Sequence, residues 1–318
     1  MKIGLIILLA AAEVGRAQAP SAPAAADELA KHAHWDHLLI QPATAQGAAR
    51  HWQHMVWPWL EMIGGSEADS SLLATLAAGA PEAPASIDPG VALKTAWRSA
   101  RPDGVLVRPD LDLTPTEMSV QPAAVAAHEP MVAWACTDHA GQRTAYVFCY
   151  DRQNHPVQAS FTPKECGFSG SVMVLNRVSG EAWRDPADED FQAPLDVTGY
   201  GYFEVAPVRS NGLVFFGDPG KFVSNGKQRI AQILEIVNGV AVTVLFAPGE
   251  HDLTIFGFAA AAPRVHAKSG AAGEVTFNVG NGRYSVLVSA PSGGSGVRSA
   301  EVEIIGGPPL PPRPSRKK

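Results

Sequence analysis

The sequence has little charge and lacks the short motifs of several common enzyme folds. Charged residues make up 18% of its 318 positions and the formal net charge is -6, so it carries no basic surface of the kind that binds nucleic acid. It contains no Gly-x-Ser-x-Gly elbow, no Cys-x-x-Cys pair and no Walker pattern. Beyond the N-terminal residues, no apolar run is long enough to cross a bilayer. We therefore expect no nucleic-acid partner and no membrane span.

Cysteine is also scarce. Cys136, Cys149 and Cys166 are the three cysteines of the chain, and an odd number allows at most one intramolecular pair. Nothing in their spacing selects that pair. Each lies in or beside an apolar run, where a free cysteine usually acts as a small buried hydrophobe. We expect that role for all three.

The N-terminal residues favour export. Lys2 is followed by the apolar run Ile3 to Ala10, and small residues stand at Gly15 and Ala17. A run this short fits a secretory signal rather than a membrane span. The alternatives are a buried N-terminal strand and a displaced start codon. We expect a signal peptide over residues 1–19, an Ala- and Pro-rich linker over 20–30, and a periplasmic or secreted protein.

Residues 31–100 favour helices. Trp52, Met55, Trp59 and Ile63 recur at spacings of three and four, which is the pattern of an amphipathic helix, interrupted here by Pro58. Shorter helices are predicted over Ser71 to Ala78 and over Ala92 to Ser99. An apolar helical face without a partner would promote self-association.

After Arg101 the pattern becomes that of β structure. Gly, Pro and Asn separate short apolar or alternating runs, and Asn238-Gly239 predicts a two-residue turn with positive φ at both positions. The stretch Gly212 to Phe222 is followed by a second turn, which favours a β corner over a phosphate loop. We predict an antiparallel β-sandwich over residues 101–305 and a basic, Pro-rich tail over 306–318. The expected core residues are Trp134, Val147, Phe215, Leu245 and Ile255.

Several short blocks occur in an order known from one glycosidase family. They are His34-Trp35-Asp36-His37-Leu38, Ser86-Ile87-Asp88-Pro89-Gly90, the stretch Arg101 to Arg108, the strand Ala145 to Tyr150, and Ile255-Phe256-Gly257-Phe258. Together they resemble the C-terminal part of the raffinose synthase and seed-imbibition branch of the α-galactosidase-like glycoside hydrolases.

The resemblance implies a short α-helical remnant of a (β/α)8 barrel over residues 31–100, followed by the β-sandwich. It also implies a carbohydrate partner, with Trp35 stacking on a sugar face and Asp36 accepting hydrogen bonds from hydroxyl groups. The family's Lys-x-Asp nucleophile motif and Arg-x-x-x-Asp acid/base motif do not precede His34 here. A retaining glycosidase needs both carboxyl groups. We therefore expect a glycosyl-hydrolase-related protein that lacks the catalytic carboxylates and needs no cofactor.

The same segment supports a second interpretation. His32, His34, Asp36 and His37 satisfy the pattern His-x-His-x-Asp-His of metallo-β-lactamase-fold hydrolases, in which such side chains bind zinc and activate a hydroxide. This alternative is a divalent-metal hydrolase of a small-molecule substrate, a lactone (for example an acyl-homoserine lactone) or a β-lactam. Further ligands would have to come from residues such as His139 or Asp218. A third alternative is a non-catalytic interaction module.

Overall fold

A computed structural model describes residues 75–76, 79, 85–86, 88–94, 97–116, 119, 130–150, 158–195 and 200–307. Its first named element is the short helix α6 (Pro89–Lys94). The backbone N–H of Gly90 donates to Asp88 Oδ1 over 2.8 Å, and proline at the first helical position has a suitable φ. The predicted helix over Ala92 to Ser99 is therefore wrong in its limits, because this cap starts the helix earlier and residues 97–99 form a turn.

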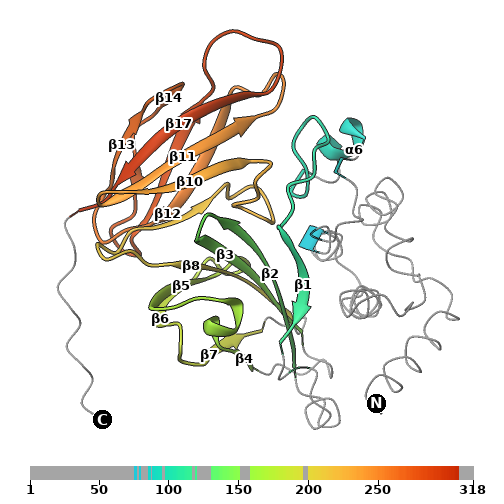
Figure 1. Cartoon of the computed structure of the whole chain (residues 1–318), viewed down its shortest axis with the longest axis vertical. Coiled ribbons are helices and arrows are strands. Elements are labelled where there is room, and N and C mark those ends of the chain that lie inside the picture. Colours follow the sequence, from blue (N-terminus) through green and yellow to red (C-terminus); the bar gives the residue numbers. More distant parts are fainter. Residues whose placement is uncertain are drawn as a thin grey trace, which may run out of the picture.

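The N-terminal half of the β structure is one antiparallel sheet of six strands (Figure 1). A tight turn at Ala140 and Gly141, both with positive φ, joins its two longest strands, as expected for a primed hairpin turn. The strand order is β1 (Leu111–Pro115), β2 (Met131–His139), β3 (Gln142–Tyr150), β8 (Tyr200–Pro207), β5 (Ser171–Asn176) and β6 (Ala182–Pro186).

A small layer packs on one face of this sheet. It consists of the strand pair β4 (Gln158–Phe161) and β7 (Phe191–Pro194) with the 3-10 helix η2 (Pro163–Cys166). Phe161, Phe191 and Phe203 pack with ring centroids between 5.4 and 6.2 Å apart. These rings belong to a buried cluster that includes all three cysteines. The layer therefore closes the core of the N-terminal half.

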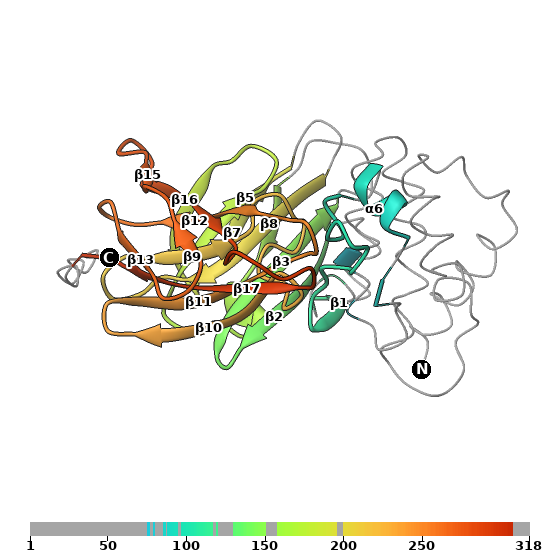
Figure 2. The same ribbon diagram turned by 90° about the horizontal axis from the view of Figure 1, so that it is seen from above.

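The C-terminal half consists of two antiparallel sheets. The first has the order β10 (Ile230–Ile236), β11 (Gly239–Phe246), β17 (Arg298–Ile305) and β13 (Arg264–Ala267). The second has the order β14 (Ala271–Ala272), β16 (Arg283–Ser289), β12 (Asp252–Phe258) and β9 (Val214–Gly217), with β15 (Thr276–Phe277) beside β16. Figure 2 shows these strands from above.

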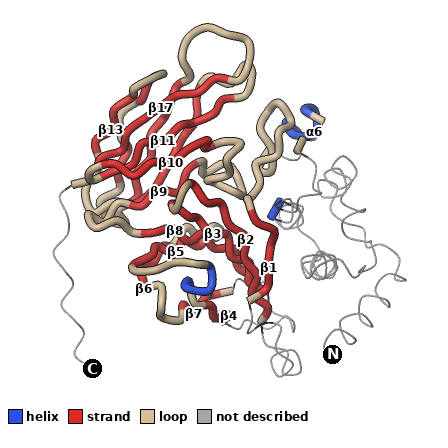
Figure 3. The backbone as a smooth tube through the Cα atoms, in the orientation of Figure 1, coloured by secondary structure: helices blue, strands red, loops and turns tan. Residues whose placement is uncertain are grey.

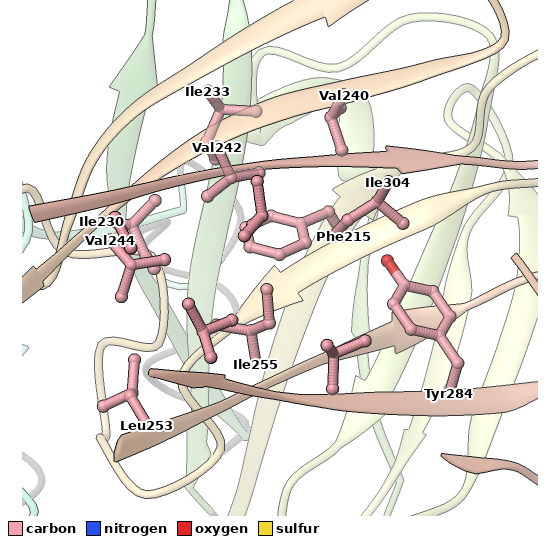
Figure 4. Close-up of a cluster of buried hydrophobic side chains, with 14 of the residues drawn as sticks. Phe215, Ile230, Ile233, Val240, Val242, Val244, Leu253, Ile255, Tyr284 and Ile304 are labelled. Atoms are coloured by element: carbon pink, nitrogen blue, oxygen red, sulfur yellow. The ribbon is translucent and has the colours of Figure 1, made fainter. Parts of the chain in front are cut away.

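One core lies between these two sheets. Figure 4 shows Phe215, Ile255, Val242 and Ile304 pointing toward one another from strands of both sheets. Alternate residues of β11 are fully buried here, because successive side chains of a strand point to opposite faces.

That alternation corrects one expected core residue. Leu245 is only partly buried, since Val244 and Phe246 on either side of it point into the core. Val147, Phe215 and Ile255 are buried as predicted, and Trp134 packs on the N-terminal cluster as a partly buried residue.

The predicted turn at Asn238-Gly239 is also corrected. Ile236 pairs with Gly239, so Val237 and Asn238 are the turn residues, and of these only Asn238 has a positive φ, at 57°. Gly239 is needed for another reason. A Cβ at this position would lie 2.2 Å from the carbonyl oxygen of Ile304 on β17.

The prediction of a mainly β, antiparallel structure is confirmed. Strands dominate the described residues in Figure 3, and between residues 101 and 307 the named elements of the described chain are strands and η2. The helical barrel remnant falls almost entirely outside the described residues. Among those that are described, no helix is long and apolar enough to cross a membrane.

An apolar layer joins the two halves. Phe216, Phe256 and Phe258 on the outer face of the second C-terminal sheet pack with Leu175 of β5 and Ala206 of β8. Phe216 and Phe256 stack with their centroids 5.7 Å apart, and Phe258 meets Phe216 edge-on. The candidate site described next lies beside this layer.

Candidate functional site

The site residues predicted from the N-terminal segment are not among the described positions. Trp35 and Asp36, predicted to line a sugar pocket, lie outside the described residues, as do His32, His34 and His37. Both interpretations of this segment stay predictions. Over the part of the chain that the structure describes, no three His, Cys, Asp or Glu side chains come together as a metal-binding group.

A largely buried loop, residues 218–229, connects β9 to β10 and lies at the junction of the two halves. We call it the junction loop. It begins after Gly217, whose φ is 90° and whose Cβ, if present, would lie 2.3 Å from Asn225 Oδ1. Asp218 N donates to Ser224 O over 2.9 Å, which folds the loop back on itself. The loop continues into β10 rather than into a helix, so it is a β corner, as the sequence predicted.

Arg229, at the end of the junction loop, is the most buried cation of the site, with 1% of its surface exposed. Its guanidinium contacts Glu250 through both Nη atoms, over 2.5 and 3.0 Å, and its Nε lies 3.1 Å from Asp218 Oδ2. Burial raises the pKa of Asp218, and the charge of Arg229 opposes that effect. Arg229 therefore compensates two carboxylates that would otherwise be costly to bury.

Two more cations attach the junction loop to the segment before β1. Lys221 Nζ donates to the carbonyl oxygens of Trp97 and Ala100, and burial lowers the pKa of this amine to about 8. Arg101 Nη1 donates to Gln228 O over 2.9 Å and its fork binds Asp103. Arg101 belongs to the block Arg101 to Arg108, which is part of the family resemblance. This block therefore holds the junction loop in place.

Glu204 of β8 is a fully buried carboxylate beneath the junction loop. Its Oε2 accepts a hydrogen bond from Arg177 Nη1 over 2.9 Å. Arg177 Nη2 also donates to Pro219 O and Lys221 O in the loop, over 2.8 and 3.1 Å. Burial raises the pKa of Glu204 to about 7, and the charge of Arg177 opposes this rise.

Polar side chains of β2 and β3 hold the far end of the loop. Asn225 Nδ2 donates to Thr144 Oγ1 over 2.8 Å, and Asn225 N donates to the hydroxyl of Tyr146 over 3.2 Å. His139 Nε2 lies 2.8 Å from Asn225 O, and burial lowers the pKa of His139. As a neutral ring, His139 donates through Nε2 to this carbonyl. Its role in this network is structural.

The surface next to this network presents an aromatic side chain to solvent. Trp97, which follows α6, is 53% exposed, and its Cζ3 would lie 3.8 Å from a Cβ at Gly220. The guanidinium of Arg98 lies over the ring of Phe222, 4.2 Å from its centroid, and 6.0 Å from the centroid of Trp97. Because the loop beneath is held by buried ion pairs, the indole borders a fixed surface.

The buried ion pairs and hydrogen bonds of this site hold the junction loop in position. Asp218, Glu204 and Glu250 are each paired with an arginine, as expected of buried carboxylates that are held in ion pairs. A cavity of about 10 Å³ lies beside Thr144, Asn225 and Phe215. That volume suits about one water molecule and is too small for a sugar ring.

The cysteines have no chemical role in this arrangement. All three are free and buried, and burial raises the pKa of Cys136 to about 11. Cys136 pairs with Ala145 across the β2 and β3 ladder, while Cys149 pairs with Val132. Cys136 and Cys149 are thus four positions apart along the ladder, about 13 Å at the rise of a strand, too far for a disulfide. The prediction of small buried hydrophobes is confirmed.

The sequence carried a signal for part of this site that we did not use. Glu204 is a lone charge inside the apolar run Tyr202 to Val208, and a charge in a buried strand requires a partner. Its partner Arg177 follows β5, and no local pattern connects the two. Trp97 lies within the helix predicted over Ala92 to Ser99, so the sequence did not indicate that its side chain is exposed.

Comparison with known proteins assigns the chain to no family. No family model and no curated protein matches it. Among solved structures, an isomalto-dextranase of Arthrobacter globiformis T6 complexed with panose is similar at 12% identity and a TM-score of 0.22. The alignment covers 61% of this chain and 40% of that enzyme. A likeness at this level establishes neither a shared fold nor a function.

Proposed function

We propose that this chain is an exported, carbohydrate-associated protein whose β structure is a supporting, non-catalytic module. In this proposal the pair of C-terminal sheets is a β-sandwich, and Trp97 is a surface contact for the sugar. Any deeper sugar pocket would belong to the N-terminal segment that contains Trp35 and Asp36. The observation that carries the proposal is the exposed indole of Trp97 on the surface held by the junction loop.

An exposed indole has the shape and chemistry that a sugar face requires. Its ring offers a flat apolar surface for the C–H groups of a pyranose, and aromatic side chains are effective anchors because they are large and rigid. Gly220 has no side chain to cover the indole edge beside it. The neighbouring guanidinium of Arg98, which packs on Phe222, supplies a polar group at the rim.

The positions of the resembling blocks also support a module without chemistry of its own. The Arg101 to Arg108 block fastens the junction loop through Arg101. In the block Ile255 to Phe258, a Cβ at Gly257 would lie 2.1 Å from the carbonyl oxygen of Val214 and 2.6 Å from the hydroxyl of Tyr284. These blocks therefore act in packing, which is the role expected of the non-catalytic C-terminal part of a glycosidase.

Sugar binding by matched variants tests the proposal. Isothermal titration with a panel of neutral α-linked galacto- and gluco-oligosaccharides should detect a ligand for the intact protein. Trp97→Ala should weaken that binding by about two- to tenfold, since aromatic stacking contributes about 0.5–1.5 kcal/mol, and Trp97→Phe should retain part of it. Leu93→Ala is the control, because Leu93 is another exposed apolar side chain, on neighbouring α6.

Two results would contradict the proposal. One is the absence of binding to every sugar by the folded wild-type protein. The other is equal binding by Trp97→Ala and the wild type, which would remove Trp97 from the contact surface.

A further inference from the structure

Arg283 is a cation at the rim of the apolar layer that joins the two halves. It begins β16, and because its neighbour Tyr284 points into the C-terminal core, Arg283 lies on the outer face of its sheet. Its guanidinium carbon lies 4.9 Å from the ring centroid of Phe256. Within the described residues the guanidinium has neither an ion pair nor a hydrogen bond, and the polar contacts of Arg283 are made by its backbone, with Asn281 Oδ1 and Asn278 N.

A second guanidinium lies over the same ring. The Cζ of Arg177 is 5.6 Å from the centroid of Phe256, but Arg177 is buried and its donors are used by Glu204, Pro219 and Lys221. Glu204 is the carboxylate that pairs with Arg177, and Arg283 has no such ion pair within the described residues. The charge of Arg283 is left without a counter-charge among these groups.

The surroundings of Arg283 disfavour its positive charge unless an anion lies nearby. Burial lowers the pKa of Arg283, and the like charge of Arg177 lowers it further. A guanidinium nevertheless stays protonated in proteins. Stacking on Phe256 restrains its planar fork, and such a fork binds oxyanions through two parallel hydrogen bonds.

We propose that Arg283 binds an oxyanion, the carboxylate or sulfate group of a small ligand, at the junction of the two halves. Phe256 orients the fork and Arg177 adds positive potential from beneath. The bound anion neutralises the positive charge of Arg283, which has no carboxylate partner among these groups. This site does not depend on the carbohydrate proposal, because neutral sugars lack the group that it recognises.

The test is a titration of the full chain with two simple probes, sodium sulfate and sodium acetate, at an ionic strength held constant with sodium chloride. Calorimetry should show saturable binding of at least one probe, and the tighter of the two identifies the preferred group. Arg283→Gln should weaken binding by about tenfold or more, because it removes both the charge and the fork. Arg283→Lys should weaken it less.

Arg264→Gln is the matched control. Arg264, on β13, is an exposed arginine, and this substitution removes the same charge without touching Phe256. It should leave the affinity unchanged. Equal binding by Arg283→Gln and the wild type would overturn the proposal, as would an equal loss in Arg264→Gln. If Arg283→Gln does not fold, Arg283→Lys decides the question, and unchanged affinity in that variant would overturn the bidentate site.

Discussion

Replacing Glu204 with glutamine should remove a specific part of the pH dependence of folding. Glu204 is fully buried, and burial raises its pKa from an ordinary value near 4.5 to about 7. A carboxyl group with a raised pKa in the folded state binds its proton more tightly there than in the unfolded chain. Its contribution to stability is therefore complete below about pH 4.5 and is lost as the pH rises through 7.

The size of the effect follows from the shift. A shift of this size corresponds to about 3 kcal/mol at 1.36 kcal/mol per pH unit. The free energy of unfolding of the wild type, relative to that of Glu204→Gln, should thus fall by about 3 kcal/mol between pH 4 and 8. The cost of leaving Arg177 without its carboxylate is the same at every pH in the variant, so it shifts the difference without changing its slope.

Urea unfolding at intervals of one pH unit between 4 and 8 measures this difference. Glu274→Gln is the control, because Glu274 is exposed and its replacement also removes one negative charge. The wild-type and Glu274→Gln curves should run parallel. Parallel curves for the wild type and Glu204→Gln, or a difference that grows with pH, would refute the account of Glu204.

Three further predictions address the other parts of the account. Arg229→Met should lower the free energy of unfolding by about 3–5 kcal/mol in urea titrations, because it removes the guanidinium that pairs with both Asp218 and Glu250; a loss below about 1 kcal/mol would contradict the compensating role. Gly257→Ala should cost at least about 2 kcal/mol in the same assay, since its methyl group would overlap Val214 O and Tyr284, whereas Gly296→Ala, where nothing lies within 4 Å of the Cβ, should cost less. If the histidine segment binds zinc, hydrolysis of a lactone or β-lactam should be lost with a chelator and in His34→Ala; turnover that survives both treatments, or the absence of turnover with zinc added, would exclude the metal-hydrolase alternative.

Local pattern predicts the central strands well and the edge strands poorly. β12 covers Asp252 to Phe258, where apolar residues are frequent and face the core. The strands β6 and β13 lack such a run of apolar residues. They read Ala-Trp-Arg-Asp-Pro and Arg-Val-His-Ala, and as edge strands they are stabilised by one neighbour rather than by a buried face of their own.

The candidate site was less accessible to sequence reasoning than the fold. Arg101 and Gln228 are 127 positions apart in the chain, and only the folded topology brings such groups together. Gly239 shows the same limit on a smaller scale. The sequence marked it as a turn residue, whereas its function is to admit the backbone of β17, which no neighbouring residue indicates.

The most direct test of the central claim is the fate of a sugar held by the purified chain. Equilibrium dialysis against a fluorescent α-linked oligosaccharide, followed by chromatography of the recovered sugar, reports binding and cleavage in one sample. The account predicts that the wild-type protein retains the sugar, that Trp97→Ala does not, and that the recovered sugar is intact. Retention that does not depend on Trp97, or cleavage that is lost on substitution of a single Asp or Glu, would contradict it.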